Sequence, residues 1–459
     1  MSFWRRGQSL KGLDLGRSFY FLWSGESLAI FGMALTEFAL GVWVYSSTGS
    51  AVAFANVVLA ATLPAVLFLP LAGGLADRIS HRLIIVLCDV TLALLLAGVI
   101  GLLWLDRLQP MHLYIFNCIA SIVSAFRAPA YQAAVSAAVS PERYTQASGL
   151  MGITKNVSSL VAPLLAGMIM AKAGLVSVLM VDLITFCSGT VLVIKAFSHV
   201  PWARAAREES TDDAVLGGAL SNVMAGLKFF SASRLMIWLL VYTVMRNALL
   251  SMVTLMMAPL LLSTLGSDSL GMAYTWAALG GLLGAGGLVS MGARRRLMLM
   301  AAIADLLLSI CIIALGLVSQ IAAYCAVAFG AIMVASVADA GVNALWMSRI
   351  PVGNRASAFA LINMLTIAFS SLAIFVGGVL VDHWFGPAMI LGGAYADSIG
   401  VWLGVGVGRG VGLLFVITGA VFAVMAIAAL LHGPMRRLEG AKSEAPVQQA
   451  DDTAQADAL

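Results

Sequence analysis

The sequence that decides the fold covers residues 51–104 and reads AVAFANVVLAATLPAVLFLPLAGGLADRISHRLIIVLCDVTLALLLAGVIGLLW. It holds two apolar runs, at about 52–75 and 82–105, and a short polar loop with glycines and basic residues lies between them. An apolar run of about 20 residues is long enough to cross the hydrocarbon core of a bilayer as a helix. The stretch therefore predicts two membrane-spanning helices that are joined by a loop at one membrane face.

The composition of the whole chain supports the same conclusion. Of its 459 residues, 61% are hydrophobic and only 10% are charged, and the mean hydropathy is +0.98. A soluble domain carries about 25% charged residues, so this chain lacks the polar surface that such a domain needs. The composition excludes an ordinary soluble protein and predicts a multi-pass membrane protein in contact with the lipid bilayer.

Other classes of site find no support in the sequence. The net charge of +4 gives no reason to expect nucleic-acid binding. The five cysteines are widely spaced inside apolar runs with no histidine at ligand spacing, so we expect neither a disulfide framework nor a metal site. The sequence shows no phosphate-binding loop with lysine and no set of nucleophile and base, so we expect no cofactor and no enzyme activity.

Charge clusters, polar turns and glycine, proline or serine residues divide the apolar sequence into helices. Each segment has the length of a membrane span, and the predicted fold is an all-α membrane protein with twelve transmembrane helices. The predicted spans are about 18–45, 52–75, 82–105, 111–140, 145–172, 175–198, 234–263, 269–291, 296–318, 320–349, 355–381 and 409–432.

Lysine and arginine are distributed unevenly between the two sides of these spans. Of the 26 basic residues, about 20 fall on the side of the N-terminus and about three on the other side, the rest lying within spans. Cytoplasmic loops of membrane proteins carry the excess of positive charge. We therefore expect both termini to lie in the cytoplasm and the number of spans to be even.

Two short motifs recur in the second half of the chain. Residues 73–77, GGLAD, correspond to residues 286–290, GGLVS, and residues 146–149, QASG, correspond to residues 355–358, RASA. The offsets, 213 and 209 positions, are close to half the chain. A parallel six-plus-six repeat is typical of transporters whose two bundles rock about a site between them. The predicted domains are an N-terminal bundle at 1–198, a cytoplasmic linker at 199–233, a C-terminal bundle at 234–435 and a disordered cytoplasmic tail at 436–459.

The loop at residues 73–82, between the second and third spans, resembles the signature loop of the major facilitator superfamily. It departs from the family pattern at Ser80 and His81, which replace a glycine and a basic residue. The positions that match are Gly73, Asp77, Arg78 and Arg82. The resemblance implies a fold of two six-helix bundles that are related by pseudo-two-fold symmetry.

Further segments resemble the exporters of this superfamily. Ala162, Pro163 and Gly167 in the fifth span are similar to the Gly-Pro motif of its antiporters, with Ala162 in place of a glycine. Other segments are similar to a bacterial drug-exporter branch that includes macrolide-efflux and siderophore-export relatives. These segments are FALGVWVY at 38–45, TGS at 48–50, PAY at 129–131 and GVGVGRG at 404–410. The resemblance implies efflux across the bacterial plasma (inner) membrane and a role in multidrug resistance.

Charged residues inside apolar spans are costly, so each is by default a functional hypothesis. The resemblance implies that the first, fourth, seventh and tenth helices line a central cavity, and every one of them carries a charge. The residues are Glu26, Glu37, Arg127, Arg246 and Asp339. They are candidates to exchange ion-pair partners with a proton or a substrate; the alternative is a set of fixed ion pairs that only satisfy one another.

Glu26 and Glu37 are the leading candidates for proton coupling. A carboxylate in an apolar bundle can bind and release a proton, whereas a guanidinium group stays charged. Lys155 lies off the cavity helices, and we expect it either to stabilise Asp182 or Glu37 or to serve transport.

The signature loop also predicts a gate at the cytoplasmic face. The carboxylate of Asp77 can accept hydrogen bonds from N–H groups at a helix N-terminus, and the resemblance implies that this helix is the eleventh, which starts near Arg355. The alternative is a plain basic loop with one helix cap. We expect a structural role for Asp89 in the third span and for its counterpart Asp305 in the ninth. The predicted gate residues are Gly73, Asp77, Arg78, Arg82 and Asp89.

The sequence thus predicts a secondary transporter that exports an amphipathic small molecule, such as a drug, a macrolide-like natural product or a siderophore. We expect it to work by alternating access, with protons as the coupling ion in antiport, and as a monomer. A cavity with few charges suits such a compound better than a sugar, which needs many hydrogen-bonding side chains. An importer of the same fold, a non-transporting membrane sensor and a lipid flippase are the alternatives.

Overall fold

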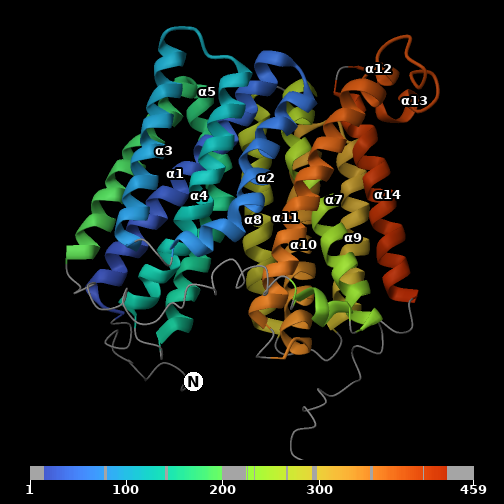
Figure 1. The fold of residues 1–459 in the computed structure, drawn as a ribbon. Coiled ribbons are helices and arrows are strands. Elements are labelled where there is room, and N and C mark those ends of the chain that lie inside the picture. The colour runs from blue at the N-terminus through green and yellow to red at the C-terminus, as the bar shows by residue number, and fades with distance from the viewer. Residues whose placement is uncertain are drawn as a thin grey trace, which may run out of the picture.

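The structure is a computed structural model, and every regular element that it describes is a helix. Figure 1 shows that the long helices run side by side along one common direction. The described residues are 15–76, 80–139, 143–198, 224, 226–231, 233–264, 267–291, 297–351, 355–406 and 408–431.

The first group of helices, which we call the N-half, covers the predicted N-terminal bundle. Its fifth and sixth predicted spans form one continuous element that is broken at Gly174, where φ is 74°. Glycine allows this left-handed conformation because it has no Cβ atom. The helices are α1 (Arg17–Thr48), α2 (Ala51–Ala76), α3 (His81–Trp104), α4 (Pro110–Ala138) and α5 (Tyr144–Ser198).

The second group, which we call the C-half, ends in a short hairpin and a last long helix. The hairpin follows α11 and contains a π-helical turn and two single-turn helices, which the sequence did not predict. The elements are α7 (Arg234–Thr264), α8 (Ser267–Met291), α9 (Leu297–Leu317), α10 (Ile321–Arg349), α11 (Arg355–Leu380), η5 (Val381–Phe385), α12 (Gly386–Met389), α13 (Gly400–Leu403) and α14 (Arg409–Leu431).

Each of the twelve predicted spans coincides with helix in the structure. Ten helices in the described ranges are long and apolar enough to cross a membrane. They include every predicted span except the one in α8, and the fifth and sixth spans count as one because they are joined in α5. The prediction of an all-α membrane protein is therefore confirmed, while the count of twelve crossings stays a prediction at α8 and α5.

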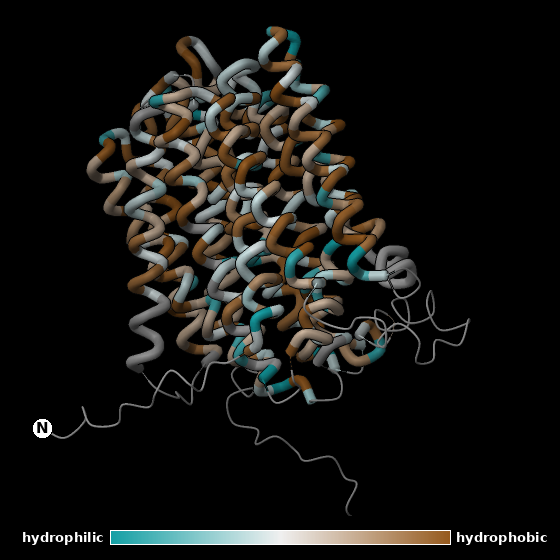
Figure 2. Tube along the Cα trace, turned by 90° about the vertical axis from the view of Figure 1, so that its left-hand side faces the viewer, coloured by the Kyte–Doolittle hydropathy of each residue, from teal (hydrophilic) through white to brown (hydrophobic). Residues whose placement is uncertain are grey.

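The outer surface of the helices has the character expected for contact with lipid. Large apolar side chains are exposed along their length, and Figure 2 shows hydrophobic residues distributed along the helices. Leu94 of α3, Leu283 of α8, Ile310 of α9 and Val424 of α14 are all more than half exposed. A helix that is apolar on its outer face and also packs on its inner face is typical of a membrane span.

The two halves lie next to each other with α2 and α11 in contact at their boundary (Figure 1). We call the face at which the described chain begins and ends, near Leu15 and Leu431, the terminal face. The other face, which holds the Gly49–Ser50 connection and the hairpin with α12 and α13, is the opposite face. The predicted linker lies mostly, and the predicted tail wholly, outside the described residues, so both remain predictions.

Apolar packing joins the halves on the side of the opposite face. One buried cluster there contains side chains from both halves, including Tyr45 and Phe54 from the N-half and Met256, Leu260 and Ile374 from the C-half. Towards the terminal face the buried clusters of the described residues are separate. One is built from N-half residues around Phe19 and Tyr131, and the other from C-half residues around Leu239 and Trp346.

Candidate functional site

A cavity of about 340 Å³ lies between the two halves. Apolar side chains from α1, α2, α7 and α8 form most of its wall, and Glu37 is the single charged residue among those that line it. The rings of Phe38 in α1 and Tyr274 in α8 contact edge to face, with centroids 5.1 Å apart. The cavity is therefore bordered by contacts that join the halves, and it is suited to an apolar molecule with a few polar groups.

The residues of the predicted antiporter motif lie in the part of α5 that faces the C-half. Pro163 lines the central cavity and also a neighbouring space of about 150 Å³ that is bordered mainly by the C-half. Ala162 is fully buried, and a Cβ atom built on Gly167 would be 3.6 Å from the Cα atom of Gly271 in α8. The motif thus borders both the cavity and the contact between the halves.

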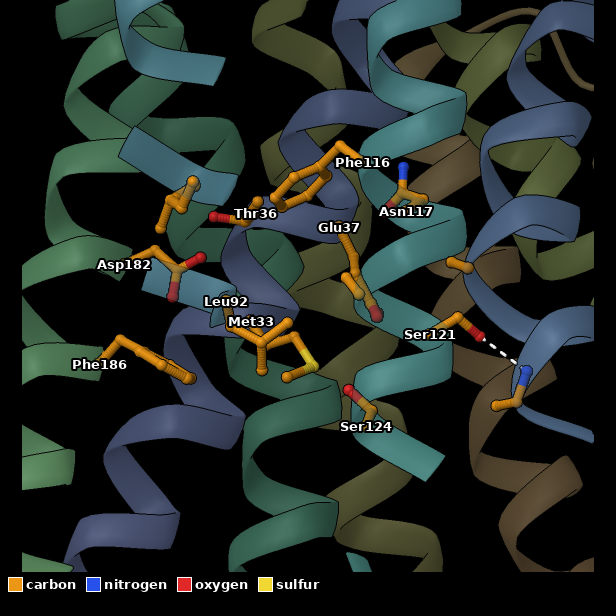
Figure 3. Close-up of a pocket in the computed structure, with 14 residues that line it drawn as sticks. Met33, Thr36, Glu37, Leu92, Phe116, Asn117, Ser121, Ser124, Asp182 and Phe186 are labelled. Atoms are coloured by element: carbon orange, nitrogen blue, oxygen red, sulfur yellow. Dashed lines mark hydrogen bonds between the residues drawn. The ribbon is translucent and has the colours of Figure 1, made fainter. Parts of the chain in front are cut away.

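Glu37 connects the central cavity to a second space. Its side chain lines the central cavity and also a pocket of about 140 Å³ inside the N-half, shown in Figure 3. In the part of the chain that the structure describes, no basic residue forms an ion pair with Glu37. Lys155 is exposed on α5 and pairs with neither Asp182 nor Glu37 among the described contacts. Glu37 is the only one of the five predicted cavity charges that lines the central cavity.

The other predicted charges of the N-half form a buried triad. Arg127 of α4 donates through Nη1 to Glu26 of α1 and through Nε to Asp89 of α3, and each distance is 2.6 Å. The second carboxylate oxygen of Asp89 accepts a hydrogen bond of 3.1 Å from the hydroxyl of Thr190 in α5. Glu26 is therefore held by an arginine, unlike Glu37.

A matching triad lies in the C-half. Arg246 of α7 is fully buried, and its Nε lies 2.8 Å from Asp305 of α9, while its Nη1 donates to Asp339 of α10. The hydroxyl of Tyr242 also donates to Asp305. Because the side chain of Asp339 is 46% exposed, this triad is buried at one end and open at the other.

The two triads are related by the internal repeat, with two of the charges exchanged. The first helix of the N-half carries the acid and the fourth helix carries the base, whereas in the C-half α7 carries the base and α10 the acid. The acid on the third helix of each half is kept. Arg127 and Asp339 are 212 positions apart, Asp89 and Asp305 are 216 apart, and Glu26 and Arg246 are 220 apart.

This arrangement differs from the expectation that all five charges face one cavity. The arginines pair with acids of their own half, and no ion pair that the structure describes crosses between the halves. The alternative of fixed ion pairs fits Glu26, Arg127 and Arg246 better than exchange between halves. The structural role expected for Asp89 and Asp305 agrees with their place in the triads.

The predicted gate residues are only partly described. Gly73 lies in α2 and Arg82 is exposed in the first turn of α3, while Asp77 and Arg78 lie outside the described residues. Asp89 is 2% exposed inside the N-half and its carboxylate is engaged by Arg127, while its grouping with the gate stays a prediction. The contact between Asp77 and the start of α11 remains a prediction.

The structure reveals a contact between the halves that sequence reasoning missed. Asp382, in the π-helical turn η5 that follows α11, accepts hydrogen bonds from the backbone N–H groups of Ala51 and Val52, each 2.9 Å long, and from the hydroxyl of Ser50. These groups form the N-terminus of α2. A Cβ atom at Gly378 would be 2.8 Å from the carbonyl oxygen of Ala51, so only glycine permits this close approach. An acid at the end of the eleventh span was the available signal.

Comparison with known proteins shows which family this chain resembles. A model of the Major Facilitator Superfamily matches residues 22–373. Macrolide efflux protein A of Streptococcus pyogenes is 25% identical over 179 residues, which cover 39% of this chain and 44% of that protein. The same protein from a serotype M6 strain matches equally. The similarity therefore spans less than half the length of these relatives.

Solved structures are similar over almost the whole chain. A bacterial homologue of the human lysosomal transporter Spinster, in an inward-facing and unoccupied conformation, has a TM-score of 0.65 at 15% identity and covers 92% of this chain and 97% of its own. An auto-inhibited POT family peptide transporter has a TM-score of 0.64 at 14% identity, covering 94% and 99%. The nucleoside transporter NupG has a TM-score of 0.62 at 15% identity, covering 90% and 99%.

These structural similarities establish the fold, and the family model matches well over half of the chain. Two halves of apolar helices, an internal repeat and a cavity between the halves are all parts of that fold. The chain belongs to the major facilitator superfamily of membrane transporters.

Proposed function

We propose that this transporter exports an amphipathic small molecule by alternating access, in exchange for protons. The observation that carries the proposal is the cavity between the halves, which is lined mainly by apolar side chains and contains one carboxylate, Glu37, without an ion-pair partner among the described residues. A bulky compound with few polar groups would lose little by leaving water for this cavity.

Glu37 is the residue to which we assign the coupling proton. Glu26 was an equal candidate in the sequence, but it is engaged by Arg127 at 2.6 Å, and protonating it would break a buried ion pair. Protonating Glu37 would break no ion pair that the structure describes. It borders the cavity, so a proton and a substrate can influence each other there through charge and space.

Alternating access requires that each face can close in turn. In the state described here, the contacts of Asp382 with α2 and the shared apolar cluster join the halves near the opposite face. We place the terminal face in the cytoplasm of a bacterium because basic residues accumulate on that side. This state would then admit substrate from the cytoplasm, and Asp77 would close that face in the other state.

Export is supported by the similarity to macrolide efflux protein A over 179 residues and by the position of Pro163 beside the cavity. The direction of transport can be tested directly. The experiment uses everted membrane vesicles, whose cytoplasmic face is outside, with radiolabelled erythromycin or ethidium as the transported compound. Acidifying the vesicle interior is expected to drive accumulation, and an uncoupler is expected to abolish it.

The same measurement in right-side-out vesicles serves as the control for direction. Accumulation there, driven by acid outside, would mean import and would contradict the proposal. Equal accumulation with and without the uncoupler in everted vesicles would contradict proton coupling. A vesicle preparation without the transporter gives the background for both arms.

A further inference from the structure

The pocket inside the N-half is a second candidate binding site. It lies among α1, α2, α3, α4 and α5 and has a volume of about 140 Å³. In Figure 3, Thr36 and Asp182 lie at one side of it, and Glu37 points into it from α1 towards Ser121 and Ser124 of α4. Glu37 borders both this pocket and the central cavity, so the two spaces adjoin at its side chain.

Three buried polar atoms of residues that line this pocket meet no partner at hydrogen-bond geometry in the described structure, although the Thr36 hydroxyl and the Asp182 carboxylate lie close enough to interact with each other. They are Oδ1 of Asp182, Oγ1 of Thr36 and Nδ2 of Asn117, and the three residues are 5%, 3% and 4% exposed. A buried polar group without a partner destabilises the folded protein. Such groups are rare in native proteins, and three of them around one pocket indicate that something polar or charged binds there.

The charged residues around the pocket indicate the sign of the charge on its ligand. Asp182 and Glu37 are acidic, and none of the fourteen residues that line the pocket is basic. The base on the neighbouring turns of α4, Arg127, already binds Glu26 and Asp89. Two carboxylates in an apolar surrounding without a counter-charge favour a cation.

The rest of the wall indicates which kind of cation fits. It consists mainly of carbon, with Met33, Leu92 and Leu96 beside the rings of Phe116 and Phe186. A bare metal ion is usually held by several charged or strongly coordinating side chains at short distance; this wall carries two carboxylates, and the described residues contain no group of three or more His, Cys, Asp or Glu side chains that could hold a metal ion. A substituted ammonium group presents carbon to an apolar wall and positive charge to carboxylates, and aromatic rings attract such cations.

We propose that this pocket binds a substituted ammonium group of the transported compound, while the apolar body of the same compound lies in the central cavity. Asp182 is the main charge partner, with the Thr36 hydroxyl beside it, and Glu37 lies at the junction of the two spaces. This inference rests on the proposed function, and it narrows the substrate class to amphipathic amines.

The experiment measures binding to the purified full-length protein in nanodiscs by calorimetry. The probe is benzyltrimethylammonium, and the matched neutral compound is neopentylbenzene, which has the same shape with carbon in place of nitrogen. We expect the wild type to bind the cation and not the neutral compound. Asp182→Asn keeps the size of the side chain and is expected to weaken cation binding by about tenfold or more, because a charge-assisted contact is lost.

Asp106→Asn is the matched control variant. Asp106 lies in the exposed turn after α3, so this change removes the same charge far from the pocket and is expected to leave binding unchanged. Equal affinity of the wild type and Asp182→Asn for the cation would overturn the proposal. So would displacement of the probe by sodium at constant ionic strength, because it would assign the pocket to an inorganic ion.

A second pair of variants keeps the test decisive if Asp182→Asn fails to fold. Met33→Lys would place a lysine ammonium in the pocket and is expected to abolish binding of the probe, while Met33→Leu is expected to retain it. Retained binding in Met33→Lys would contradict the proposal. Proton-driven accumulation of ethidium or erythromycin by the wild type in everted vesicles tests the proposed function separately, so the failure of one can be told from the failure of the other.

Discussion

The carboxylate of Asp382 caps α2 by accepting a hydrogen bond of 2.9 Å from the N–H group of Ala51, although the two residues belong to different halves. The N-terminus of a helix carries partial positive charge and free N–H groups, so an acid from the other half is a suitable partner. The contact depends on the halves being close at the opposite face, and it must break when they separate there.

Asp382→Asn is therefore expected to shift the protein towards the state that is open at the opposite face. Loss of about 1–2 kcal/mol from this contact corresponds to a change of roughly 5- to 30-fold in the ratio of the two states. Spin labels at Arg107 and Leu391 lie on exposed parts of the two halves. Pulsed electron paramagnetic resonance then measures the distance between the two labels. Asp397→Asn, in the exposed part of the hairpin, should leave the distances unchanged. An identical shift in this variant would contradict the role of the Asp382 contact in holding the halves together.

Glu37→Gln is expected to separate substrate exchange from proton coupling. The amide cannot take up or release a proton at physiological pH, so accumulation driven by a pH gradient should be lost. Exchange of labelled for unlabelled substrate across proteoliposomes needs no net proton movement and should continue. Loss of both activities would indicate that Glu37 binds substrate only, and unchanged gradient-driven uptake would remove it from coupling.

Arg246→Met is expected to be strongly destabilising. The arginine is fully buried between Asp305 and Asp339, and its removal leaves two carboxylates without a counter-charge at a cost of about 3–5 kcal/mol. Thermal unfolding of the purified protein in detergent measures the effect. Arg107→Met, at an exposed position, should change the unfolding temperature little, and a similar loss in both variants would argue against the triad.

The exchanged charges of the two triads predict a rescue. Glu26→Arg or Arg127→Asp alone should destabilise the N-half, because each puts like charges together in a buried site. The double variant reproduces the order of charges found at Arg246 and Asp339 and should recover part of the lost stability. The interaction energy from a double-mutant cycle is the measure, and strictly additive losses would contradict the equivalence of the triads.

Gly280→Ala is expected to disturb the packing of α8 on α10. A Cβ atom at Gly280 would lie 2.1 Å from the carbonyl oxygen of Phe329, so the helices would have to move apart. Overpacking of this kind costs about 1–3 kcal/mol. Gly98→Ala in α3 is the control, because its Cβ atom would meet nothing within 4 Å, and this variant should unfold at the same temperature or slightly above the wild type.

The helices could be predicted from the sequence because the length of an apolar run limits where a membrane helix can begin and end. The eleventh span, expected at 355–381, forms Arg355–Leu380, and the gap expected between the fifth and sixth spans falls at Gly174. The hairpin after Asp382 was not predicted, because its single-turn helices are held by local backbone contacts that leave no periodic pattern in the sequence.

The candidate site was only partly predictable because some of its contacts leave no pattern in the sequence. Glu37 could be found because an acid in an apolar span stands out. The pairing of Arg127 with Asp89 depends on how α3 and α4 are rotated against each other, which composition does not determine. The partner of Asp382 is the backbone of Ala51, and a backbone N–H group has no residue signature.

The placement of the triads has a mechanical consequence. Each arginine finds its acids within its own half, so the strongest electrostatic bonds described inside the membrane stay intact when one half tilts against the other. What must be broken at the opposite face is a helix cap and a layer of apolar contacts, which are weak and can form again without transferring ions through lipid. The halves can thus tilt against each other without breaking any of the ion pairs that the structure describes.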